Sequence, residues 1–121
     1  MKTTAKHFDI FVKEVSKWVD RFGLGDWRID CYHEHNLEGT RASCVFRCQG
    51  MAADIYLERE WKDEKIKIVN IRSSALHEVA HILLAKLYEQ ATSRFGITED
   101  QITEATEGII RRLERAFGDE L

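Results

Sequence analysis

The chain carries one stretch whose residue types and spacing suit metal chemistry, His77-Glu78-Val79-Ala80-His81. On an α-helix, residues four apart lie on one face about 6 Å apart along the axis, so both imidazoles can bind one ion. A catalytic zinc site adds a third protein ligand and a water, and the glutamate after the first histidine accepts the water's proton. The motif therefore predicts a zinc site with His77 and His81 as ligands and Glu78 as general base.

The residues around the motif must form a helix for this geometry to exist. Residues 74–88 contain neither Gly nor Pro, and apolar side chains recur at helical spacing at Leu76, Ala80, Leu83, Leu84 and Leu87. This pattern predicts an amphipathic helix whose apolar stripe packs on a core. Both histidines fall on the flank of that stripe, where the wall of a cleft is expected. The alternative is a helix with two partly buried, hydrogen-bonded histidines and no metal.

A third zinc ligand must come from outside the motif. The extended motif that continues with Gly and His would need them at positions 84 and 87, and this chain has leucine at both. The usual alternative is a glutamate from a later helix, for which Glu99, Glu104 and Glu107 are the candidates. Relative to the apolar stripe of that helix, Glu107 lies about 105° away, at the flank, and Glu104 about 165° away, facing water. Glu107 is therefore the predicted ligand, with Glu104 in reserve, since Glu99 in the first turn is explained by the helix dipole.

The remaining pattern predicts an α+β fold that positions these residues. A helix begins after Thr3 or Thr4, and its apolar residues continue to Phe22. Three strands are expected over 27–35, 41–48 and 51–58, the last two joined as a hairpin at Gln49-Gly50, in a mainly antiparallel sheet. After the motif helix, Thr98 and Gln101 form a capping box that starts a last helix. Its expected buried stripe comprises Ile102, Thr106, Ile109, Ile110, Leu113 and Phe117.

Composition indicates one domain over residues 1–121 and narrows the function classes. The net charge is −3 with acids and bases interspersed, so nucleic-acid binding is not expected, and Arg111, Arg112 and Arg115 are interpreted as a solvated helix face. The longest apolar run, 82–85, is too short for a membrane span, and the N-terminus lacks a secretory pattern, so a cytoplasmic location is expected.

Three cysteines without an export signal are expected to be reduced thiols. Cys44 and Cys48, with His33 and His35, would make a legitimate Cys₂His₂ zinc set. Their spacing falls on a predicted strand rather than a turn, which favours small buried cysteines in a sheet.

The order of a helix, three strands, a His-Glu-x-x-His helix and a helix with Glu107-Gly-Ile-Ile110-Arg-Arg-Leu113 resembles the small gluzincin-type metallopeptidase domains, the minimal zincin cores common in phage and prophage genomes. The resemblance implies a zincin-like fold, with His77, His81 and Glu107 as Zn²⁺ ligands and Glu78 as general base. It also implies hydrolysis of peptide bonds in a peptide or protein substrate.

Two function classes follow. The first is a zinc metallopeptidase whose substrate binds as an added strand, beside 51–58, with Asp54 and Tyr56 either lining that groove or simply exposed. The second is a catalytically inactive interaction module, phage-encoded for instance, that kept the fold with or without the metal. Activity distinguishes the two, and the sequence indicates no oligomeric state.

Overall fold

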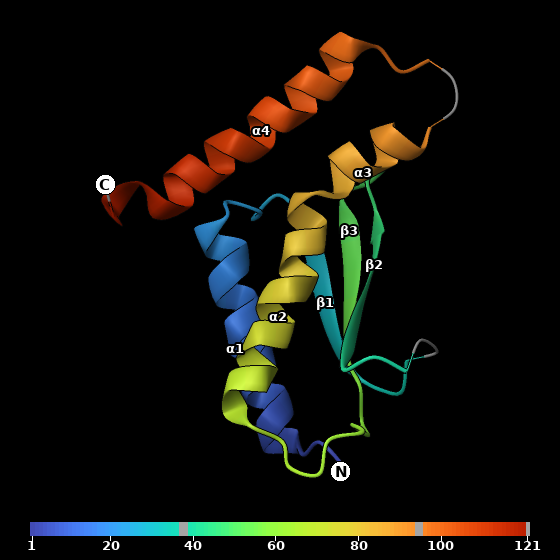
Figure 1. The fold of residues 1–121 in the computed structure, drawn as a ribbon, viewed down its shortest axis with the longest axis vertical. Coiled ribbons are helices and arrows are strands. Elements are labelled where there is room, and N and C mark those ends of the chain that lie inside the picture. The colour runs from blue at the N-terminus through green and yellow to red at the C-terminus, as the bar shows by residue number, and fades with distance from the viewer. Residues whose placement is uncertain (37–38, 94–95, 121) are drawn as a thin grey trace.

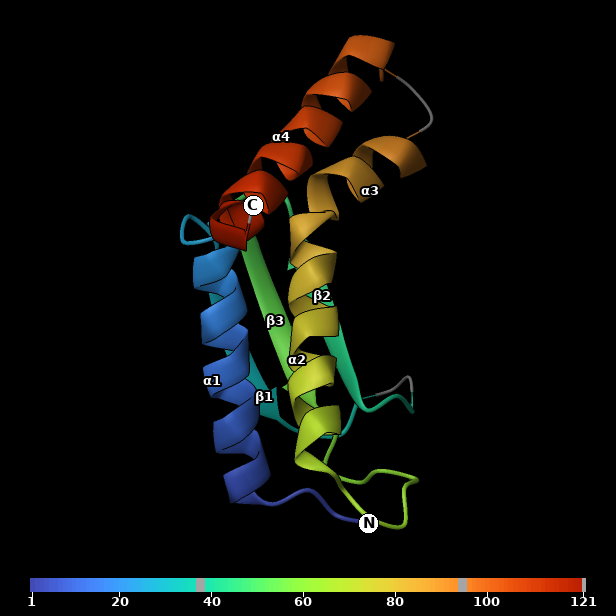
Figure 2. The same cartoon turned by 60° about the vertical axis from the view of Figure 1, so that its left-hand side comes forward.

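Two helices lie side by side on one face of a three-stranded sheet, and a further helix crosses their upper ends (Figures 1 and 2). The computed structural model describes residues 1–36, 39–93 and 96–120. The elements in chain order are α1 (Ala5–Arg21), β1 (Arg28–His33), β2 (Ala42–Arg47), β3 (Ala52–Leu57), α2 (Ile68–Leu83), α3 (Ala85–Thr92), α4 (Glu99–Phe117) and the short 3-10 helix η1 (Gly118–Glu120). The α+β class and the order predicted from the sequence are confirmed.

The sheet is mixed rather than mainly antiparallel. Its order is β1-β3-β2, with β2 and β3 antiparallel and β1 and β3 parallel. The predicted hairpin is present, and its turn uses positive φ angles at Gly50 and Met51. The central place of β3 follows from its composition, because Ala53, Ile55 and Leu57 are almost completely buried.

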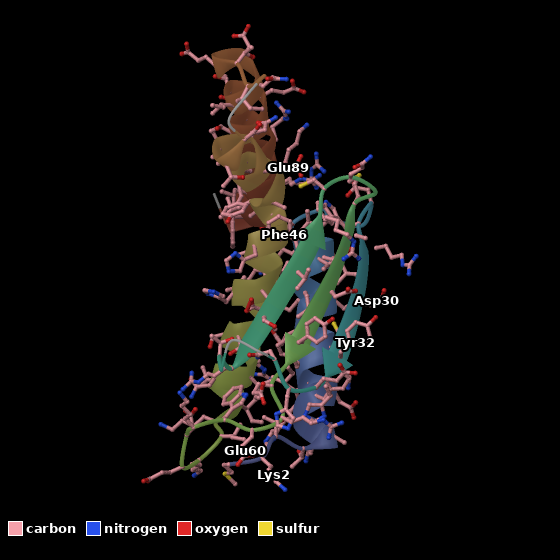
Figure 3. The ribbon with its side chains drawn as sticks, turned by 90° about the vertical axis from the view of Figure 1, so that its right-hand side faces the viewer. Lys2, Asp30, Tyr32, Phe46, Glu60 and Glu89 are labelled. Atoms are coloured by element: carbon pink, nitrogen blue, oxygen red, sulfur yellow. The ribbon has the colours of Figure 1, made fainter. Side chains whose placement is uncertain are left out.

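The core lies between the sheet and the two helices α1 and α2. Phe11 and Val15 of α1 meet the inward side chains of β3 and the apolar residues Ile71, Ala75 and Val79 of α2. Burying large apolar side chains stabilises the fold by roughly 1.5–3 kcal/mol each. None of the helices that the structure describes covers the opposite face of the sheet, and Figure 3 shows Asp30 and Tyr32 on that side.

Both predicted helix starts are confirmed. Thr4 caps α1 in a capping box with His7, and Thr98 caps α4 in a capping box with Gln101. Each box satisfies backbone N–H groups that the first turn of a helix leaves unpaired. No described helix has the length and apolar character needed to cross a membrane.

The motif helix differs from its prediction in both extent and direction. It begins at Ile68, six residues before the expected start, and ends at Leu83, after which the chain bends at Leu84 into α3. No Gly or Pro marks the bend, so it could not be predicted from local sequence. The bend buries Ala85 and brings Tyr88 of α3 into edge contact with Phe46 of β2.

The last helix does not bury the stripe predicted for it. Its buried residues are Ala105 and Ala116, whereas Ile102, Ile110, Leu113 and Phe117 are 37–41% exposed and Thr106 is exposed. The cause is that α4 attaches to the rest of the protein through a different, adjacent side of the helix. Arg112 donates to the carbonyl of Gly23, and Arg21 donates to the carbonyl of Ala116 at 3.0 Å, so polar contacts at the end of α1 set the rotation of α4. Arg112 is therefore an anchor, not part of a solvated face.

Candidate metal centre

The His-Glu-x-x-His motif lies in the last turns of α2, as predicted. One donor atom from each of His77, Glu78 and His81 can be chosen so that all three lie within 4.8 Å of one another. The two imidazole centroids are 5.0 Å apart, at 76° to each other. Ligands of one zinc ion lie about 2.0–2.2 Å from it, so they are at most about 4 Å apart, and small side-chain rotations close the difference. The group could therefore hold a metal ion, and its imidazole and carboxylate donors are types that zinc accepts.

The three side chains differ in burial. Glu78 is only 5% exposed, while both histidines are exposed to solvent. The buried stripe of α2 comprises Ile71, Ala75, Glu78, Val79 and Ile82. This stripe is rotated from the predicted one, so the histidines lie further toward solvent than expected. Glu78 is thus held by the fold, and the imidazoles remain accessible to an ion.

The motif opens onto a cleft of about 640 Å³. One wall is α2, with Ser73, Ser74 and the three motif residues, and the other wall comes from residues 39–42 and 60–63. A cleft that joins accessible donors to a buried carboxylate is the expected form of a site for a small ion and a substrate.

The wall opposite α2 is held by Arg41. Its guanidinium pairs with Asp63 at 2.5 Å and lies 5.0 Å from the ring centroid of Trp61, which is buried. The indole N–H of Trp61 donates to the carbonyl of Arg41 at 3.1 Å. These contacts join the segment before β2 to the segment after β3. Arg41, Trp61 and Asp63 could not be singled out from the sequence, because their contacts exist only after the sheet has formed.

A buried carboxylate at the end of β3 supports the same wall. Glu58 accepts from the backbone N–H groups of Asn36, at 2.5 Å, and Glu60, at 3.3 Å, and its Oε1 lies 2.5 Å from Nδ1 of His35. Burial opposes ionisation of Glu58, but the hydrogen bonds from Asn36, His35 and Glu60 outweigh it and lower the pKa of this carboxyl group. The ionised carboxylate fixes the chain where it leaves β1.

We expect Glu58→Gln to lower the free energy of unfolding by about 1–3 kcal/mol at pH 7, because hydrogen bonds to a charged acceptor are lost. Since the folded pKa of Glu58 is depressed, this stabilisation is complete above the unfolded value, about 4.3, and is lost as pH falls through the folded value. Urea unfolding at pH 7, 5 and 3 measures the difference, with Glu60→Gln as control. A difference between wild type and Glu58→Gln that stays constant from pH 7 to 3 would contradict the prediction.

The structure does not bring the predicted third ligand to the motif. Glu107 is exposed on α4, and no residue of α4 lines the cleft or joins the metal-binding group among the residues described. Glu107 could reach the motif only if its helix packed beside the motif helix, whereas α4 packs against α3 and crosses above α2 (Figure 1). Glu104 is exposed and lines a different cavity, between α4 and the rest of the protein. Glu99 lies in the first turn of α4. The acidic residues that do line the cleft with Glu78 are Glu60 and Asp63.

The alternative Cys₂His₂ site is not assembled in the part of the chain that the structure describes. His33 Nε2 lies 2.7 Å from the hydroxyl of Thr3, its ring stacks on Phe8, and His35 pairs with Glu58. The cysteines are free. Burial, followed by the negative charges of Glu78 and Asp54, raises the pKa of the Cys44 thiol to about 12.

The strand predicted to accept a substrate is not at an edge. Residues 52–57 form the central strand β3, which is paired on both sides, so they cannot accept a further strand. Asp54 and Tyr56 are absent from the lining of the cleft, and Tyr56 stacks on Tyr32 at 5.2 Å. Both residues are half-buried rather than exposed, so neither the groove nor the exposed face expected from the sequence describes them.

Comparison with known proteins adds no relative: no protein-family model, curated protein or solved structure matches this chain. Any assignment of function therefore rests on the motif and its geometry.

Proposed function

We propose that this protein is a zinc-dependent peptidase with His77 and His81 as metal ligands and Glu78 as general base. One observation supports this most: two accessible imidazoles and a buried carboxylate converge within 4.8 Å at the wall of an open cleft. Zinc accepts both donor types, and the spacing on α2 is that of a helical His-Glu-x-x-His motif.

When bound, zinc would lower the pKa of a coordinated water toward 7 and polarise a substrate carbonyl. Glu78 would take the proton of the attacking water and return it to the leaving amine. Its burial suits this role, because low solvent access strengthens its interaction with the proton it receives. His77 and His81 would hold the ion at the mouth of the cleft, within reach of solvent and substrate.

The strand that suits an extended peptide is β2. It is an edge strand of the sheet, it packs against α2, and Ala42 at its start lines the cleft. An extended peptide can add to such an edge through backbone hydrogen bonds, which give affinity with little sequence preference. This supports a peptide as substrate class, with β2 rather than residues 51–58 as the strand that accepts it.

Zinc-dependent cleavage of a peptide mixture tests the proposal. We expect the purified chain to cleave unstructured peptides with zinc, to lose cleavage after chelation, and to regain it when zinc is returned. Mass spectrometry of the products reports the cleaved bonds. His81→Ala, prepared in parallel, controls for contaminating peptidases. Cleavage that survives both chelation and His81→Ala would contradict the proposal.

A second function, a non-catalytic interaction module, is favoured by one specific observation. The metal-binding group among the described residues contains two histidines and Glu78, with no further carboxylate. If Glu78 itself completes the ligand set, it is not free to act as base, and the metal would then be structural. Metal binding without hydrolysis of any peptide would support this second function.

A further inference from the structure

The surface of α4 carries an apolar stripe that the fold leaves partly uncovered, although Phe117 at its C-terminal end packs edge-on against Phe22 and under the guanidinium of Arg21. Ile102, Ile110, Leu113 and Phe117 are each 37–41% exposed, and the exposed Thr106 lies among them. At 100° per residue these five side chains occupy a sector of about 80° on one side of the helix. The stripe runs over 16 residues, about four turns or 24 Å. We name these five residues the α4 stripe.

The rest of the protein packs along one side of the α4 stripe and also touches Phe117 at its C-terminal end. Ala105 and Ala116, the buried residues of α4, lie about 80–100° from its centre on that side. Arg112, on the same side, donates to the carbonyl of Gly23 and pairs with Asp26 at 3.8 Å. These contacts fix the rotation of α4, so the helix cannot turn its stripe inward without breaking them.

The other side of the α4 stripe is acidic. Glu107 and Glu114 lie about 80–100° from its centre, opposite Ala105 and Ala116, and both are exposed. Neither glutamate forms an ion pair with any residue that the structure describes. A partner would therefore meet an apolar surface bordered by two glutamates, with the exposed Arg111 lying one row further round the helix.

This charge pattern decides between possible occupants. In an antiparallel pair of α4 helices from two copies, the same flank of each helix meets, so Glu107 and Glu114 would face glutamates. A parallel pair would place them against the side that carries Ala105 and Ala116, which the protein itself covers. Self-association is disfavoured in both arrangements, whereas a helix with lysines or arginines beside its apolar side chains gains attraction.

We propose that α4 is a docking surface for an amphipathic helix of a partner protein, with apolar side chains on the α4 stripe and basic side chains against Glu107 and Glu114. The spacing of Thr106, Ile110, Leu113 and Phe117 alternates between four and three residues, which suits packing of one helix along another. This surface lies outside the metal cleft and does not depend on zinc.

Two synthetic helical peptides test the docking surface. Both carry leucines at alternating three- and four-residue spacing, one flanked by lysines and the other by glutamates. Fluorescence anisotropy with the whole chain should show binding of the lysine peptide at least tenfold tighter than that of the glutamate peptide. Leu113→Asp should abolish binding. The double variant Glu107→Lys, Glu114→Lys should reverse the preference, while Glu104→Lys, on another side of α4, should leave it unchanged.

Circular dichroism of each variant separates loss of the surface from loss of the fold. Equal affinity for both peptides, no binding of either, or a preference unchanged by the double charge reversal would each overturn the proposal. So would sedimentation showing that the wild type dimerises and Leu113→Asp does not, because the occupant would then be a second copy. None of these outcomes depends on metal or peptidase activity.

Discussion

Replacing His81 with alanine should remove stoichiometric zinc from the purified protein. The wild type, washed with chelator and reloaded, should hold one zinc ion per chain, because the imidazoles of His77 and His81, the proposed ligands, lie next to each other on α2 with ring centroids 5.0 Å apart. Removing one imidazole leaves a ligand set too small for tight binding. Elemental mass spectrometry after gel filtration measures the ratio of zinc to protein. His35→Ala is the matched control, because His35 contacts Glu58 away from the motif.

The melting temperature gives a second measure of zinc binding at the same site. Zinc that binds only the folded state adds about 2.7 kcal/mol when free zinc is a hundredfold above the dissociation constant. For a chain of 121 residues this corresponds to a rise of roughly 10 °C in melting temperature. The rise should appear in the wild type and in His35→Ala but not in His81→Ala. A wild type that holds no zinc after reloading would remove the basis for a metal centre.

The ratio of zinc to protein also tests whether Glu107 is a zinc ligand. Because the structure keeps this residue out of the metal-binding group, we expect Glu107→Ala to retain zinc as well as Glu104→Ala does. Loss of zinc from Glu107→Ala alone would instead support the ligand assignment made from the sequence, and would require α4 to approach α2.

The sequence predicted those parts of the site and fold that depend on local spacing. His77 and His81 converge because a helix brings residues four apart onto one face, and Thr4 and Thr98 cap helices through side chains three residues away. The Gln49-Gly50 hairpin also depends on local turn chemistry. None of these features requires knowledge of how distant elements pack.

The errors concern rotation and packing between elements. The helical wheel of α4 identified its apolar residues correctly. It could not show that Arg112 and Arg21 would attach the helix through a different, adjacent side. Likewise the choice of Glu107 required α4 beside α2, and the bend at Leu84, which has no Gly or Pro, sends the chain elsewhere. The parallel pairing of β1 with β3 depends in the same way on contacts distant in sequence.

Replacing Glu78 with glutamine should separate catalysis from metal binding. As the general base, Glu78 contributes proton transfer that is typically worth 10²–10⁴-fold in rate, so Glu78→Gln should lower kcat by at least a hundredfold while the zinc content stays near one. Glutamine has nearly the same shape, so the buried position, 5% exposed, remains filled. Peptide hydrolysis and elemental analysis on one preparation measure both quantities, and Glu89→Gln on α3 is the control for a glutamate outside the cleft.

The two roles open to Glu78 lead to opposite results in this variant. If its carboxylate is a zinc ligand, the neutral amide should weaken zinc binding, so metal content and melting temperature would fall together with activity. If it is the base, activity alone falls. Full activity in Glu78→Gln would contradict both roles, because the buried carboxylate would then serve only the packing of α2 against the sheet.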